Sequence, residues 1–307
     1  MNNFSCAYNS AANQTTMTNR VVLFLVSILL FFSACTKKTT SVIMPPQPFF
    51  LYQWNFEGAD ALHDLFIEDA SAQKNGVAIV VDPINPSNKV CKTTLLKGND
   101  RTELSIYTSD LKKIIYFYAD AAKGFTDKAN SIPDENSLGN EVWMSMKIFK
   151  PQQQNTNGIK PCIAQLGPVS NASLNPPVSS SGFCQLRMRN GTTPGGDNWN
   201  WRVFGGTAYT SAALDMDNSF VKPNYGKWEH FVFHCVYSTG SNGLIEVWKD
   251  GVKYITTSGA NAIPFNRFRI KWGLYLGIGS SAGEDLTCYY DDIKIGDKRS
   301  SYESITQ

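Results

Sequence analysis

The chain has 307 residues, and its 28 Lys and Arg against 26 Asp and Glu give a formal net charge of +2. This near balance, without any run of basic residues, argues against a nucleic-acid partner. The seven cysteines include no CxxC pair, and several lie in apolar stretches, so a thiol-based metal or redox centre is not favoured.

The first element is an apolar run over residues 21–34, too short to span a bilayer comfortably. Arg20 precedes it, and two small residues lead directly into Cys35, which is the order of parts in a signal peptide. The run resembles a bacterial lipoprotein signal, although Phe32 stands where Leu is usual. We therefore expect export, lipidation of Cys35, and an outer-membrane location facing the periplasm or the cell surface. An uncleaved anchor or a buried core segment is the alternative.

This assignment divides the chain into three parts. Residues 1–34 are the expected signal peptide, and residues 35–49 are the lipidated cysteine with a tether that contains Lys and Pro. Residues 50–307 remain for one large domain, which we expect to be monomeric and held at the membrane by the lipid.

Strand-like segments recur through this domain, rich in Val, Ile, Phe, Tyr and Trp and mostly bounded by Gly, Pro, Asn or Asp. They cover residues 76–81, 89–96, 141–149, 162–166, 183–189, 199–204, 228–237, 243–249, 268–276 and 286–295. Asp250-Gly251 between two such runs predicts a hairpin turn. Short helices are expected only at 59–65, 109–113 and 119–123. Many strands and few helices predict a two-sheet sandwich or jelly roll.

Three strand-like patches place polar side chains two residues apart. Because successive side chains of a strand point to opposite faces, Arg101 shares a face with Glu103, and Lys271 shares one with Tyr275. If these strands and the one carrying Gln165 are neighbours, the five side chains converge on one open surface. Such a set of cations and donors suits chemistry on an acidic sugar.

The strand over residues 183–189 continues the pattern, since Arg187 and Arg189 fall on one face. If that face is concave, its cations would attract a polyanion, and both are candidate substrate-binding residues. An ordinary solvated strand face is the alternative.

The motifs Arg101-x-Glu103-Leu, Gln165 and Lys271-x-Gly-x-Tyr275, in this order, resemble R-x-E-L, Q-x-H and K-x-G-x-Y of the jelly-roll polysaccharide lyases. These include the heparin lyase I-like, glucuronan lyase and family-seven alginate lyase groups, and the similarity spans about residues 56–296. The resemblance implies an all-β, concanavalin-like jelly-roll sandwich of two antiparallel sheets with few short helices. One departure is that Gly167 stands where these enzymes have His.

The resemblance also implies β-elimination at a uronic acid of an acidic polysaccharide, with no cofactor required. Arg101, Gln165 and Lys271 would stabilise the charge that develops on the substrate carboxylate. Tyr275 would contact the C5 proton or the leaving oxygen, and Glu103 would orient a neighbouring cation and help to bind substrate. Since the family His is missing, the alternative is a carbohydrate-binding lipoprotein that has lost catalysis. A glycoside hydrolase with unrecognised carboxylates is a third interpretation.

Two further hypotheses concern the missing His and a metal. His230 and His234 lie an even number of residues apart in one apolar strand, so they share a face. If this face lines the substrate groove, they are candidates to replace the missing His, and His234 is taken as a substrate-binding residue. Structural roles are the alternative. Glu57 and Asp292 resemble the ligands of a structural Ca²⁺ in related sugar-binding sandwiches. A surface Glu and a turn Asp are the alternative.

Overall fold

The computed structural model describes residues 50–69, 75–108, 113–114, 117–118, 139–154, 160–168, 184–189, 197–203, 216–238, 240–261, 267–277 and 279–307. The described residues belong to one compact unit. The expected signal peptide, Cys35 and the tether lie outside the described residues and stay predictions. No helix in the described ranges is long and apolar enough to cross a membrane.

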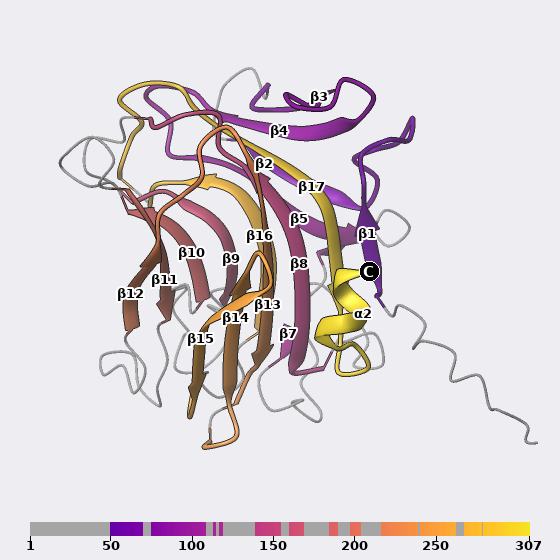
Figure 1. The fold of residues 1–307 in the computed structure, drawn as a ribbon, viewed down its shortest axis with the longest axis vertical. Coiled ribbons are helices and arrows are strands. Elements are labelled where there is room, and N and C mark those ends of the chain that lie inside the picture. The colour runs from indigo at the N-terminus through magenta and orange to yellow at the C-terminus, as the bar shows by residue number, and fades with distance from the viewer. Residues whose placement is uncertain are drawn as a thin grey trace, which may run out of the picture. The chain divides into compact units, whose positions relative to one another are not determined.

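One sheet has eight antiparallel strands. They are β1 (Tyr52–Trp54), β3 (Val77–Val81), β4 (Lys89–Leu95), β8 (Glu141–Phe149), β13 (Trp228–Val236), β14 (Leu244–Lys249), β15 (Val252–Ser258) and β17 (Leu286–Gly296). The order across the sheet is β15-β14-β13-β8-β17-β4-β3, and β1 pairs with β17. Figure 1 shows β8, β13 and β17 of this sheet as long curved ribbons.

The second sheet has nine strands. They are β2 (Leu65–Asp69), β5 (Arg101–Thr108), β6 (Lys113–Ile114), β7 (Phe117–Tyr118), β9 (Cys162–Pro168), β10 (Cys184–Arg189), β11 (Asn198–Val203), β12 (Met216–Val221) and β16 (Arg267–Tyr275). The order is β12-β11-β10-β9-β16-β5-β2, with β6 on β5 and β7 on β16. The strands β9 to β12 follow one another in the sequence, whereas β16 joins β9 to β5 from a distant part of the chain.

The core lies between the two sheets, where large side chains from their inner faces meet. Trp199 and Trp201 of β11 are almost fully buried, as are Phe231 and Phe233 of β13. The rings of Trp201 and Phe233 stack with centroids 5.1 Å apart, and those of Trp199 and Phe231 meet edge to face at 4.8 Å. Because these residues alternate with others along each strand, every second side chain must point outward. The fold is the predicted jelly-roll sandwich of two antiparallel sheets.

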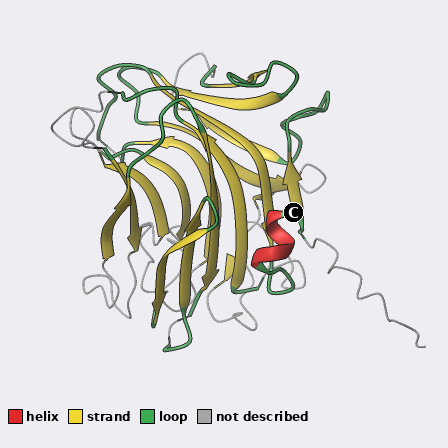
Figure 2. Cartoon of the chain, in the orientation of Figure 1, coloured by secondary structure: helices red, strands yellow, loops and turns green. Residues whose placement is uncertain are grey.

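The ten predicted strands are all present, with ends that differ by at most two residues. The hairpin turn between β14 and β15 is also confirmed, since Asp250 and Gly251 both have positive φ, 50° and 82°. The only helix in the described ranges is α2 (Tyr302–Thr306), which was not predicted. Figure 2 shows how strongly strand dominates.

The helix expected over residues 59–65 is wrong. Residues 59–64 form turns, and β2 begins at Leu65 and pairs with β5. An isolated helix of only seven residues is marginally stable, whereas pairing with β5 satisfies the backbone hydrogen-bonding groups of the five residues of β2. The stretch 119–123 lies outside the described residues, as does most of 109–113.

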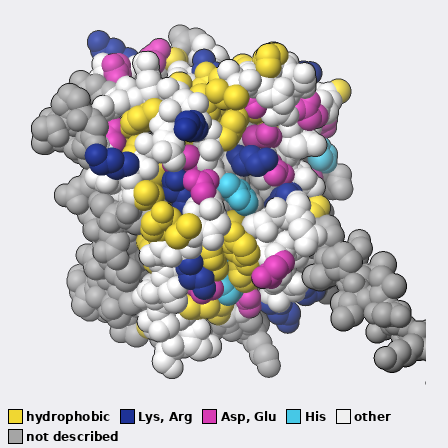
Figure 3. Space-filling model, in the orientation of Figure 1, with side chains coloured by type: hydrophobic (Ala, Val, Ile, Leu, Met, Phe, Trp, Pro, Cys, Tyr) yellow, Lys and Arg dark blue, Asp and Glu magenta, His cyan; other side chains and the backbone are white. Residues whose placement is uncertain are grey.

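The outer face of the eight-stranded sheet is partly covered by α2. Trp143, Val232, Trp248 and Ile305 form a small apolar cluster there, separate from the main core. In the view of Figure 3, hydrophobic, basic and acidic side chains are intermixed and no single charge dominates.

Candidate active site

The nine-stranded sheet carries a polar row on its outer face, where β5, β16 and β9 are neighbours. On β16 the row consists of every second residue, namely Arg269, Lys271, Gly273 and Tyr275. Trp272 and Leu274, which alternate with them, are fully buried in the core, so the row lies on the opposite, outer face. Tyr275 lies directly opposite Arg101 of β5 in the strand register. The alternation expected for these strands is therefore present.

Lys271, Gln165 and Glu103 form the centre of the row. Lys271 pairs in register with Gln165 of β9, whose Nε2 donates to Glu103 Oε1 at 2.6 Å. Lys271 Nζ lies 3.5 Å from Glu103 Oε2. Only 1% of Glu103, 5% of Lys271 and 8% of Gln165 is exposed, so the centre of the row is buried and is not the open surface expected from the sequence. Mutual hydrogen bonds at low local dielectric hold these groups in fixed positions.

Glu68 on β2 is a member of the row that the sequence pattern did not reveal. Its Oε2 accepts hydrogen bonds from Lys271 Nζ at 2.7 Å and from Arg101 Nη1 at 2.9 Å. Its Oε1 lies 2.6 Å from Arg269 Nη2. One carboxylate therefore holds three cations, and it stands opposite Glu103 in the register of β2 and β5. No motif marks Glu68, and its strand follows directly on the segment expected to be helical.

The surroundings shift the pKa of each central group. Burial raises the pKa of Glu103, although Lys271 and Arg101 act in the other direction. For Lys271, whose charged form is the protonated one, burial lowers the pKa. Burial would also raise the pKa of Glu68, but the charges of Lys271 and Arg269 outweigh it and hold that pKa below its ordinary value. Glu68 is thus the fixed negative charge of the row.

Tyr275 is positioned by Arg101, whose guanidinium carbon lies 4.2 Å from the centre of the phenol ring. This is a cation–π contact. Arg101 is in turn fixed by Glu68, and its Nε lies 3.5 Å from Glu103 Oε2. The ring and the guanidinium are therefore two parts of one arrangement.

Gly273 explains why a glycine separates Lys271 from Tyr275. Its φ is +130°, and a Cβ at this position would lie 2.3 Å from the carbonyl oxygen of Thr102 on β5. Without a side chain, β16 approaches β5 closely enough to pair Tyr275 with Arg101.

The row extends onto β10 through two glutamines. Gln185 Nε2 donates to Gln165 Oε1 at 3.2 Å. Arg187 Nε donates to Gln185 Oε1 at 2.8 Å, and Arg187 Nη2 donates to the same oxygen. Arg187 thus belongs to the same hydrogen-bonded system as Glu103. The backbone of Arg189 pairs with Asn198 of β11, while its side chain lies outside what the structure describes.

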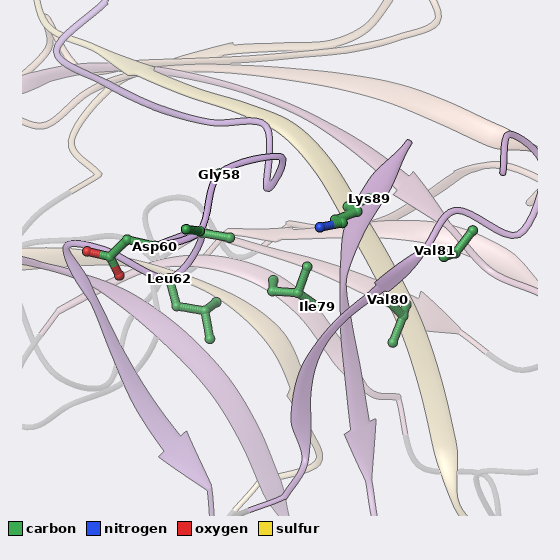
Figure 4. Close-up of a pocket in the computed structure, with 9 residues that line it drawn as sticks. Gly58, Asp60, Leu62, Ile79, Val80, Val81 and Lys89 are labelled. Atoms are coloured by element: carbon green, nitrogen blue, oxygen red, sulfur yellow. The ribbon is translucent and has the colours of Figure 1, made fainter. Parts of the chain in front are cut away.

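A hollow of about 300 Å³ opens at the end of the row beside Tyr275. It is lined by Lys160, Cys162, Arg187, Arg202, Tyr275, Leu276 and Gly277. A larger hollow of about 510 Å³, shown in Figure 4, lies between residues 58–62 and β3, with Lys89 at one side. Its lining is mainly aliphatic and includes no member of the polar row, so the smaller hollow belongs to the candidate site.

The expectation that His234 shares a groove with Tyr275 is wrong, because β13 belongs to the other sheet. The imidazole of His234 stacks on the ring of Trp143 with centroids 3.8 Å apart. Its Nδ1 lies 2.8 Å from Glu246 Oε2 and its Nε2 lies 3.0 Å from Glu141 Oε1. His230 is also on β13, so neither histidine replaces the one missing at position 167.

The surroundings of Asp292 do not fit a bound cation. Its Oδ1 lies 3.2 Å from Lys294 Nζ, and its Oδ2 lies 3.4 Å from Lys147 Nζ. Glu57 Oε1 accepts a hydrogen bond from the backbone nitrogen of Lys89 at 2.8 Å. Among the described residues, no group of three or more His, Cys, Asp or Glu side chains could hold a metal ion. The calcium site at Glu57 and Asp292 stays a prediction without support from this geometry.

The sequence model of a family described as polysaccharide lyase matches residues 74–294. Among solved structures, an endo-β-1,4-glucuronan lyase from the fungus Trichoderma reesei is similar, with a TM-score of 0.56 at 12% identity over 84% of this chain and 98% of that one. This likeness concerns the fold.

Two alginate lyases are more distant in structure. One, a marine PL-14 enzyme from Aplysia kurodai, has a TM-score of 0.49 at 9% identity over 81% of this chain and 99% of that one. The other, from a Chlorella virus, has a TM-score of 0.44 at 12% identity over 72% and 88%. No curated protein sequence matches this chain.

Proposed function

The chain belongs to the polysaccharide lyase family, and on that premise we propose that it cleaves a uronic-acid-containing polysaccharide by β-elimination on the outer face of the nine-stranded sheet. The observation that supports this site is the joining of Arg101, Lys271, Gln165 and Tyr275 in one network around Glu68 and Glu103. In the proposed reaction the C5 proton leaves, the C4–C5 double bond forms, and the bond from C4 to the glycosidic oxygen breaks.

The cations of the row suit the charge that this reaction develops. As the C5 proton is removed, negative charge accumulates on the adjacent carboxylate, and groups held in place beforehand stabilise it most. The cluster contains three cations and two carboxylates, so its net charge is positive. Its members are Arg101, Arg269, Lys271, Glu68 and Glu103.

Tyr275 is the proposed acid and base. Its oxygen accepts the C5 proton as phenolate, and the resulting hydroxyl then donates a proton to the leaving C4 oxygen. Since one group serves both atoms, the proton and the leaving oxygen must lie on the same side of the sugar ring. The proposed elimination is therefore syn.

Arg269 offers a cation where the family motif has its missing His. It pairs in register with Gly167, and its guanidinium is held by Glu68. We assign Arg269 the part of stabilising the substrate carboxylate that a histidine beside Gln165 would otherwise share. This role fits the two-residue spacing that places Arg269 on the same face as Lys271.

An activity panel separates the lyase from a binding protein. Purified protein is incubated with glucuronan, alginate or heparin, while ultraviolet absorbance reports the unsaturated uronate and chromatography reports chain length. Shortening of at least one polymer with a matching rise in absorbance is expected. Shortening without absorbance would favour hydrolysis, and binding without shortening would favour a carbohydrate-binding lipoprotein.

We propose in addition that the enzyme is an exported, monomeric lipoprotein of the outer membrane, anchored through Cys35. The apolar run before Cys35 supports this assignment. Metabolic labelling with a radioactive fatty acid should mark the wild-type chain and leave Cys35→Ser unlabelled. Labelling of both would contradict the anchor site. Size-exclusion chromatography of a chain that begins after the tether tests whether the domain is a monomer in solution.

A further inference from the structure

The hollow beside Tyr275 differs in charge from the rest of the polar row. Its described lining includes Lys160, Arg187 and Arg202 and no acidic side chain. Three cations around one small hollow create a local positive potential that attracts an anion.

Strand register explains how these cations come together. Cys162 at the start of β9 lies opposite both Arg187 of β10 and Tyr275 of β16. The register of β9 shifts against both neighbouring strands beside this point, which indicates a bulge. Arg202 of β11 lies opposite Gln185, so it is on the same face as Arg187. Three separate segments thus contribute one cation each.

A buried amide lies next to these cations. Asn200 of β11 is opposite Arg187 in register and two residues from Arg202, so it shares their face. It is fully buried, and neither its Nδ2 nor its Oδ1 has a hydrogen-bond partner among the described residues. Because nearly all buried polar groups in proteins are hydrogen-bonded, an unmet buried amide calls for an explanation, and a bound ligand is one.

The size of the hollow suits part of a sugar chain. A volume of about 300 Å³ is at the lower end of ligand sites, which hold about 300–1,000 Å³. Tyr275 belongs both to this hollow and to the contact with Arg101, so a group in the hollow would be a direct neighbour of the sugar at Tyr275.

We propose that Lys160, Arg187 and Arg202 bind the carboxylate of the sugar next to the one that loses its proton. The inference rests on the proposed lyase function and narrows the substrate to polymers that carry carboxylates on consecutive sugars. Arg187 presents a planar fork suited to a carboxylate, and its hydrogen bonds to Gln185 fix its orientation. A polymer in which each uronate is flanked by neutral sugars would leave the hollow without its anion.

The test uses glucuronan and samples of it in which a known fraction of carboxyl groups has been reduced to neutral alcohols at random. If two adjacent carboxylates are needed, the kcat/KM of the wild-type enzyme falls with the square of the remaining carboxylate fraction. If one suffices, kcat/KM falls in simple proportion and the proposal is overturned. A polymer that is never cleaved would instead count against the lyase function itself.

A double variant tests whether Lys160 and Arg202 cause the dependence on the neighbouring carboxylate. Lys160→Gln with Arg202→Gln should raise KM on intact glucuronan about 10- to 100-fold and restore simple proportionality on the reduced samples. The matched control, Lys89→Gln with Lys253→Gln, removes two charges from the other sheet and should leave both properties unchanged. An unchanged KM in the first variant would overturn the subsite while leaving the lyase function intact.

The same variants distinguish a carboxylate from a sulfate. Heparin alternates uronates with sulfated amino sugars, so it offers a sulfate at the neighbouring position. If the double variant loses activity on heparin and keeps it on glucuronan, the assigned ligand is wrong. A loss on glucuronan supports the proposal.

Discussion

The guanidinium of Arg101 lies over the ring of Tyr275 at 4.2 Å, and the same guanidinium donates to Glu68 at 2.9 Å. Glu68 also accepts from Lys271, so the orientation of the phenol and the position of the ammonium depend on one carboxylate. This link joins β2, β5 and β16, which are consecutive in the sheet but far apart in the sequence. The proposed chemistry therefore rests on a charge that touches neither the proton nor the leaving oxygen.

The first prediction concerns the proposed acid and base. Tyr275→Phe keeps the ring that Arg101 contacts and removes only the oxygen, so the fold and substrate binding should persist. We expect kcat to fall at least about 100-fold, the lower range for loss of general acid–base catalysis. Tyr254→Phe on β15 of the other sheet is the matched control. A Tyr275→Phe enzyme with an unchanged rate would remove this residue from the mechanism.

The second prediction tests Glu68 as a positioning residue. Glu68→Gln keeps the shape of the side chain and removes the charge shared by Arg101, Arg269 and Lys271, so kcat should fall about 10- to 100-fold with a smaller change in KM. Stability should fall as well, by about 3 kcal/mol, since three cations lose a nearly buried partner. Glu246→Gln also removes a carboxylate that pairs with a cation, but on the other sheet. It should leave kcat unchanged.

The shared face of Lys271 with Tyr275 and of Arg101 with Glu103 was predictable because its signal is local, although Arg269 was not among the predicted site residues. Alternation along β16 and β5 depends only on neighbours in the chain, and burial of Trp272 and Leu274 fixes which face the polar residues take. Glu68 was not predictable, because its role arises from the pairing of β2 with β5, across more than 30 residues. The same limit explains His234: parity shows that it shares a face with His230, but it does not show in which sheet that face lies.

The sequence pattern also did not predict that the centre of the row is buried. A polar side chain on an outward face is expected to be solvated, yet Glu103 is only 1% exposed. Its cross-strand partners are Gln165 of β9 and Lys271 of β16, which reach it only after three strands have aligned, whereas Arg101 is on the same strand as Glu103. Alternation therefore predicts the direction of a side chain, while its exposure depends on neighbours across the sheet.

The third prediction is a dependence of stability on pH. The pKa of Glu68 in the folded chain is below its ordinary value of 4.5, because the folded state favours the ionised form. Its stabilising effect is therefore present above pH 4.5 and is lost as the pH falls through the lower, folded pKa. Urea unfolding between about pH 6 and about pH 3 should show a steeper loss for wild type than for Glu68→Gln. Parallel curves would contradict the assignment of this ionised charge to Glu68.

The last prediction concerns the glycine between Lys271 and Tyr275. Gly273→Ala must place a Cβ 2.3 Å from the backbone oxygen of Thr102 and 2.7 Å from the Cα of Glu103, so β16 and β5 must separate. Gly139→Ala is a matched control, because Gly139 also has positive φ, +73°, but no atom of the described residues lies within 4 Å of the position that its Cβ would take.

Both variants place an alanine at positive φ, which costs about 1–3 kcal/mol. Only Gly273→Ala adds the backbone overlap, so its unfolding free energy should fall by at least about 2 kcal/mol more than that of Gly139→Ala. Its kcat should fall as well, because separating the strands moves Tyr275 away from Arg101. Equal stability of the two variants in urea would show that β5 and β16 can move apart freely, and the close approach at Gly273 would then not be what aligns the phenol with the guanidinium.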